Sequence, residues 1–106
     1  MIEKIYNKKK FYALIVRSSY KKKKGVNFFT DKKATQQFGY MYHKKGHIIL
    51  PHRHNKRYSK ILWTTEVIII QDGILRVDFY DDNEKYLRSK KIYKNDIIML
   101  AGGGHG

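Results

Sequence analysis

Short β-prone segments separated by turn residues recur along the chain, and this pattern constrains the fold more than any other feature. The segments rich in Ile, Val, Leu, Tyr and Phe are 11–16, 39–43, 86–93 and 97–100. Residues 75–80 alternate, with Leu75, Val77 and Phe79 on one face and polar or aromatic side chains on the other. Repeated short strands of this kind are typical of an all-β sandwich or barrel. We therefore expect one all-β domain over residues 1–106.

Three segments carry more specific signals. The uninterrupted β-branched run within residues 63–71, Val67-Ile68-Ile69-Ile70, predicts a strand buried on both faces. Asp72-Gly73 follows it and is typical of a two-residue hairpin turn. Residues 30–38 lack strand alternation and begin with Thr30, a helix N-cap residue, so they predict a short helix.

Composition excludes several classes of protein. No apolar run approaches the roughly 20 residues that a membrane helix needs, and the first residues lack the apolar region of a signal peptide. We therefore expect a cytoplasmic protein without a membrane partner. The chain has no cysteine, which excludes disulfides and thiolate sites. Any metal site must be built from histidines and carboxylates.

The formal net charge of +14 has two interpretations. Lysine runs at 8–10, 21–24, 32–33 and 44–45 would attract phosphate, as in a nucleic-acid-binding barrel. However, lysine far outnumbers arginine, the residue best suited to bidentate phosphate contacts, and a lysine-rich bias is what A/T-rich codons produce. The sequence therefore favours solvated charge over a nucleic-acid interface, which we keep as an alternative.

Histidines and one glutamate form the clearest chemical pattern. His52 and His54 are separated by one residue, Glu66 follows, and His105 is the penultimate residue. Imidazole and carboxylate are ligands of first-row metals, and residues i and i+2 of a strand point to the same face. His52 and His54 on one strand could thus reach one ion side by side. Exposed histidines in a basic loop are the alternative interpretation.

The spacing of these residues resembles the cupins. Gly46, His52-x-His54, Glu66 and Gly73 follow the order of the first cupin motif, with a longer gap before the glutamate. Residues 94–100 resemble the start of the second motif, and residues 102–106 stand where its last histidine occurs. Further segments look like a family of small single-domain cupins that are typically encoded among genes for surface-polysaccharide and nucleotide-sugar biosynthesis. These segments are 36–41, 51–55, 76–81 and 103–106.

The resemblance implies a cupin-like double-stranded β-helix, or jelly-roll barrel. It also implies that a divalent transition metal (Fe, Mn, Ni, Cu or Zn) is bound by four ligands: His52, His54, Glu66 and His105. The expected partner is a small molecule, a sugar or nucleotide sugar, and a homodimer is expected on the same grounds. The reaction is unassigned: isomerisation, epimerisation or oxidation, with a nearby Tyr or His moving protons, stands beside a non-catalytic ligand-binding role.

Other residues receive less specific interpretations. His43 and His47 are expected at the surface or in a pocket lining, and Asp78 and Asp96 in turns or on outward faces. Four aromatic residues could stack on a sugar but are more typical of a core. They are Tyr40, Tyr42, Tyr58 and Trp63.

The end of the chain carries its own expectation. The resembled cupins continue past the last histidine with a strand that closes the barrel, and no such segment follows His105. We therefore expect a C-terminally truncated domain, or a second subunit that supplies the strand. His105, carried by three glycines, is expected on a fraying terminus that weakens the metal site.

Overall fold

The computed structural model describes residues 1–22 and 24–106, so Lys23 of the basic run 21–24 lies outside the described residues. Its described residues form nine β-strands and no α-helix. They divide into two compact units: residues 1–20 with 63–106, here called the sandwich unit, and residues 21–62, the loop unit. Nothing in the described part of the chain forms a helix long and apolar enough to cross a bilayer. The single domain over residues 1–106 stays a prediction.

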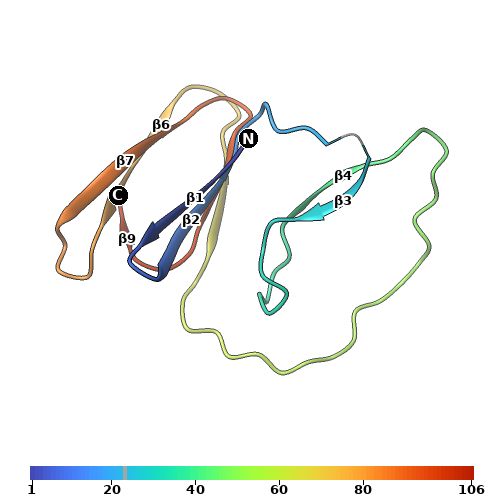
Figure 1. The fold of residues 1–106 in the computed structure, drawn as a ribbon, viewed down its shortest axis with the longest axis horizontal. Helices are drawn as coiled ribbons and strands as arrows, with labels where there is room; N and C mark the ends of the chain where they lie inside the picture. The colour runs from blue at the N-terminus through green and yellow to red at the C-terminus, as the bar shows by residue number, and fades with distance from the viewer. Residues whose placement is uncertain (23) are drawn as a thin grey trace. The chain divides into compact units, whose positions relative to one another are not determined.

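The sandwich unit contains two antiparallel sheets (Figure 1). The four-stranded sheet has the order β1 (Ile2–Asn7), β2 (Lys10–Val16), β8 (Ile97–Leu100), β5 (Glu66–Ile69). The three-stranded sheet has the order β7 (Tyr86–Ile92), β6 (Leu75–Tyr80), β9 (Gly104–His105). The predicted strands in these ranges are confirmed, whereas β1 and β9 were not predicted.

A β-bulge between β1 and β2 determines which side chains enter the core. Ile5 pairs with Ala13 and Tyr6 with Phe11, so Tyr12 is the extra residue. An extra residue re-aims the side chains that follow it, and here Tyr12 and its neighbour Ala13 both join the buried cluster. Tyr12 would otherwise take the opposite face of the strand.

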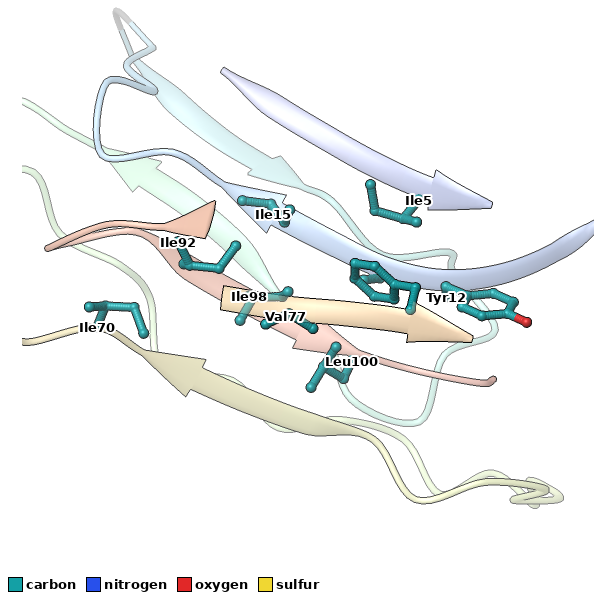
Figure 2. Close-up of a cluster of buried hydrophobic side chains, with 10 residues drawn as sticks. Ile5, Tyr12, Ile15, Ile70, Val77, Ile92, Ile98 and Leu100 are labelled. Carbon is teal, nitrogen blue, oxygen red and sulfur yellow. The ribbon is translucent and has the colours of Figure 1, made fainter. Parts of the chain in front are cut away.

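The two sheets share one apolar core (Figure 2). Ile15, Ile98 and Leu100 come from the four-stranded sheet, and Val77 and Ile92 come from the other sheet. The rings of Tyr12 and Phe79 meet edge to face, with centroids 6.2 Å apart. The alternation predicted for β6 is confirmed, because Val77 and Phe79 are buried while the residues between them are not.

Strand β5 differs from its prediction. It pairs with β8 alone, so it is an edge strand, and Val67 and Ile69 are 48% and 61% exposed. Only Ile68 and Ile70 face the core, which gives the run one buried face instead of two. Asp72-Gly73 turns the chain with Gly73 at φ 78°, but β5 and β6 belong to different sheets, so the predicted hairpin is wrong.

A charged cluster fixes the turn before β8. The Asp96 carboxylate is buried and accepts hydrogen bonds from the backbone N–H groups of Tyr93 and Ser18 and from the Arg17 guanidinium, all at 2.9 Å. Arg17 also contacts Glu3, which receives a bond of 2.9 Å from Lys90. Asp96 is thus a turn residue, as expected, and its charge is compensated inside the unit.

The loop unit contains one small sheet and a folded turn. Strands β3 (Gly25–Phe28) and β4 (Gly39–Tyr42) pair antiparallel; only β4 was predicted. The predicted helix over 30–38 is wrong, because side chains in this segment bond to its own backbone. Thr30 Oγ1 accepts from the Phe38 N–H at 3.1 Å, and Asp31 Oδ1 accepts from the Lys33 N–H at 2.8 Å. Such local bonds compete with helical ones.

The all-β, antiparallel character of the chain is therefore confirmed. None of the three sheets formed by the described residues closes into a barrel. The cupin jelly roll accordingly stays a prediction.

We expect Asp96→Ala to lower the free energy of unfolding by about 3 kcal/mol, because it removes several charge-assisted hydrogen bonds and leaves Arg17 half-paired. Asp82→Ala is the matched control. Its carboxylate is 78% exposed and pairs with Lys10 at the surface, so the change should cost no more than about 1 kcal/mol. Urea denaturation measures both, and equal losses would contradict the central role of Asp96.

Acid should destabilise the protein through the same cluster. Hydrogen bonds from Arg17 and Lys90 lower the pKa of Glu3. Burial alone would raise the pKa of Asp96. The hydrogen bonds that Asp96 accepts from the Tyr93 and Ser18 amides and from Arg17 outweigh burial, so its pKa is lowered as well. Because both folded pKa values lie below the unfolded ones, this stabilisation is complete above about pH 5 and lost as pH falls through the folded values.

The urea midpoint should therefore drop between pH 5 and pH 3, by less in Glu3→Gln than in the wild type. Exposed Glu84→Gln should follow the wild-type curve. A Glu3→Gln curve as steep as that of the wild type would show that Glu3 contributes nothing to the acid sensitivity.

Candidate metal and ligand site

The two histidines of Pro51-His52-Arg53-His54 lie in the loop unit on a stretch without regular secondary structure. The prediction that they share a strand is wrong, because no strand occurs in residues 43–65. Pro51 contributes to this, since proline has no N–H to donate to a neighbouring strand. Both imidazoles are exposed. The longer gap before Glu66, residues 55–65, also contains no strand.

A hydrogen bond orients the ring of His52. Its Nδ1 lies 2.9 Å from the Leu50 carbonyl oxygen. A carbonyl oxygen can only accept, so Nδ1 carries the proton and Nε2 presents its lone pair. Metal-bound histidines commonly hold their second ring nitrogen in this way. His52 therefore has the tautomer that a metal ligand needs.

His54 lies beside His52. Their ring centroids are 5.8 Å apart and the ring planes differ by 28°. The two rings are thus brought close together without a partner strand. His43 and His47 form a different pair, stacked face to face with centroids 4.0 Å apart across a turn. The rings of the first pair lie farther apart and at a larger angle than those of the second.

Glu66 is the first residue of β5 in the sandwich unit. It pairs directly with Leu100, which belongs to the buried core. Directly opposed residues of antiparallel strands share a face, so Glu66 occupies an inner-face position of the sheet. Its side chain is nevertheless exposed, because it stands at the end of the strand.

His105 lies in β9, and the expectation of a fraying terminus is wrong. It pairs with Phe79 of β6, and the N–H and C=O groups of Asp78 and Gly106 exchange two hydrogen bonds of 2.8 and 2.9 Å. Gly103 makes this path possible. It has φ 86°, and an added Cβ would lie 2.4 Å from the Tyr12 ring.

The four predicted ligands therefore divide between the two units, with the histidine pair in the loop unit and Glu66 and His105 in the sandwich unit. Among the described residues, no group of three or more His, Cys, Asp or Glu side chains is gathered as a metal site. The ligand set stays a prediction. Asp78 is not one of the four predicted ligands. Its carboxylate accepts hydrogen bonds from Ser89 and Arg76 along the sheet, as expected for an outward-facing group.

An open groove of about 1090 Å³ lies within the loop unit and includes His52 and His54 in its lining. Phe28 supplies an aromatic wall, and Lys32, Arg53 and Arg57 supply positive charge. The remaining lining residues carry amides or hydroxyls: Thr35, Gln36, Gln37, Asn55 and Ser59. The groove therefore offers polar and cationic contacts around the two imidazoles.

Sequence reasoning did not find Phe28 or Arg57, and it singled out Lys32 only as part of a lysine run that would attract phosphate. Phe28 pairs with Gly39 across the small sheet, and an added Cβ on Gly39 would lie 2.7 Å from the Phe28 ring. Arg57 bonds to the carbonyl oxygens of Lys32, at 2.9 Å, and Ala34. Both arrangements depend on pairings between distant segments, which local patterns do not reveal.

The aromatic residues predicted as core or stacking groups lie elsewhere. Tyr42, Tyr58 and Trp63 are more than half exposed, so their assignment to a core is wrong. The Trp63 ring lies 5.4 Å from Lys10 Nζ and close to Gly102 in the sandwich unit. None of these three lines the groove beside His52.

Comparison with known proteins adds no assignment. No protein-family model, curated protein or solved structure matches the chain. The resemblance to small cupins therefore rests on the residues quoted above.

Gly103→Ala should destabilise the fold strongly, because it adds both backbone strain and a clash with the Tyr12 ring. We expect a loss of about 3 kcal/mol or more. Gly73→Ala is the matched control: Gly73 also has positive φ, but an added Cβ meets open space, so strain alone should cost about 1–2 kcal/mol. Thermal unfolding compares the two. A smaller loss at Gly103 would contradict its packing beneath Tyr12.

Proposed function

We propose that the chain is a small cupin-type protein that binds one divalent transition metal through His52, His54, Glu66 and His105 and acts on a sugar or nucleotide sugar. The observation that carries the proposal is the histidine pair. His52 is held by the Leu50 carbonyl with Nε2 available, and the His54 ring lies 5.8 Å away on the same stretch. Two such imidazoles can approach one ion together.

The positions of Glu66 and His105 support the same proposal. Glu66 is opposite Leu100 in one sheet and His105 is opposite Phe79 in the other, and both partners are core residues. Both candidate ligands thus occupy inner-face positions at strands whose backbones are fixed by pairing. The proposal requires the histidine pair to join them at one ion.

The donor set suits several metals. Three imidazoles and a carboxylate match Fe(II), Mn(II), Ni(II), Cu(II) or Zn(II). A bound ion of this kind supplies Lewis acidity toward an oxygen of the ligand. The protein's own contribution is to orient His52 through Leu50 and to offer the amides and hydroxyls of the groove, which are suited to sugar hydroxyls. The same groups would serve a non-catalytic sugar-binding role.

Elemental analysis after dialysis tests the metal. We expect about one equivalent of transition metal in the wild type and less than about a tenth of that in His52→Ala, because loss of a ligand weakens binding by tenfold or more. Occupancy should also fall in acid, since only neutral imidazole binds metal.

His43→Ala is the control, because His43 is an imidazole of the same unit that stacks on His47 and lies outside the motif. It should retain the full metal content. Wild-type protein without metal, or equal loss in both variants, would overturn the proposal. Turnover of a sugar nucleotide by the loaded wild type would then separate an enzyme from a binding protein.

A further inference from the structure

Positive charge is concentrated in the loop unit. Residues 21–62 contain twelve of the 23 Lys and Arg residues of the chain but only one of its nine Asp and Glu residues, Asp31. The remaining residues are nearly balanced. A codon bias toward lysine would raise the charge throughout, so it does not explain why acidic residues are missing from this unit alone.

The groove lies within this positive unit and has no carboxylate in its lining. Its cationic members are Lys32, Arg53 and Arg57, and its other polar members are donors or mixed groups. Asp31 is not part of the lining, and its Oδ1 accepts a hydrogen bond of 2.8 Å from the Lys33 N–H. Apart from the two imidazoles, the lining therefore offers few partners to a cation, whereas an anion would find several.

Hydrogen bonds hold the walls of the groove in place. Arg57 joins the two lining segments, because its guanidinium donates to the carbonyl oxygens of Lys32 and Ala34. These acceptors are neutral, so the Arg57 charge is not cancelled. Gln37 Nε2 donates to the Asp31 carbonyl oxygen at 3.0 Å and so stiffens the turn over residues 31–37, which Arg57 also contacts. The backbone that carries Lys32 and the Arg57 side chain are thus braced, which lowers the cost of ordering them around a ligand.

Phe28 adds an apolar surface beside these charges. Its ring packs over Gly39, where any side chain would collide with it, and remains 57% exposed. A flat ring held on one side and open on the other can stack on a sugar face or a nucleobase. Charge and stacking surface therefore occur in the same groove.

We propose that this groove binds the phosphate of a small phosphorylated ligand, with Lys32 and Arg53 contacting the phosphate oxygens and Phe28 stacking on the organic part. The inference rests on the proposed function for its choice of a sugar or nucleotide sugar. It does not require the metal, since the groove residues all belong to the loop unit. Arg57 is a positioning residue that holds the walls.

Isothermal titration of the full chain with inorganic pyrophosphate, after chelation of metal and at about 0.15 M salt, tests the phosphate contacts. Arg53→Gln and Lys32→Gln should each weaken binding by about tenfold, since each removes a charge-assisted hydrogen bond. Lys56→Gln is the matched control: Lys56 lies between two lining residues, Asn55 and Arg57, but does not line the groove. It should change affinity by less than about twofold. Equal losses in all three variants would show attraction to net charge alone and overturn the proposal.

Two further ligands identify the organic part. Uridine diphosphate represents a nucleotide and glucose 1-phosphate a sugar phosphate. Phe28→Ala should weaken the binding of whichever ligand stacks on the Phe28 ring and leave the affinity for pyrophosphate unchanged. Failure of both to bind more tightly than pyrophosphate would remove the stacking role. A single-stranded oligonucleotide is the competing ligand. The proposal would be overturned in favour of a nucleic-acid surface if the oligonucleotide displaced pyrophosphate and its own affinity fell as much in Lys56→Gln as in Arg53→Gln and Lys32→Gln.

The outcome is distinguishable from that of the metal proposal. Normal metal content without pyrophosphate binding would reject the phosphate groove alone. Pyrophosphate binding that responds to Arg53→Gln, together with a dialysed wild type that carries no transition metal before chelation, would reject the metal site alone. Unchanged thermal unfolding of each variant shows that a lost affinity is not a lost fold.

Discussion

The packing of the Tyr12 ring is the contact on which the sandwich unit depends. The β-bulge beside Ile5 turns this ring inward, where it meets Phe79 of the opposite sheet. On its other side the ring lies so close to Gly103 that no Cβ fits. The chain can therefore leave β8, pass beneath the ring and pair with β6. Sheet packing and the position of His105 follow from one aromatic side chain.

The strands that the sequence predicts best are those whose pattern is local. Strand β6 alternates strictly and β8 is continuously apolar, so their burial can be inferred from adjacent residues. Strand β1 contains two adjacent charged residues, Glu3 and Lys4, so it lacks a clear strand pattern and becomes a strand through pairing with β2. The apolar run at β5 looks like a central strand, but its place at the sheet edge is a property of the topology. Residues 30–38 show how side-chain hydrogen bonds override a helix signal.

The candidate site divides in the same way. The side-by-side arrangement of His52 and His54 follows from their spacing, even though no strand forms there. The groove around them could not be predicted, because Phe28 and Arg57 reach it through Gly39 and the 32–34 backbone. Hydrogen bonds between loops shape this unit together with the edge-to-face contact of Phe29 and Phe38. The exposed side chains that line the groove can be specialised for a ligand with little effect on that contact.

The pairing of β2 with β8 has a consequence for how the protein folds. These two strands are the central strands of the larger sheet, yet Ala13 and its partner Leu100 stand near opposite ends of the sequence. Closing so long a loop costs entropy before any core contact repays it, so contacts of this kind slow folding. During synthesis the edge of β2 that pairs with β8 stays unpaired until β8 has left the ribosome, and β2 is apolar on both faces. The lysine-rich segment between β2 and β8 gives the incomplete chain a positive charge, and charge repulsion opposes its association with other chains.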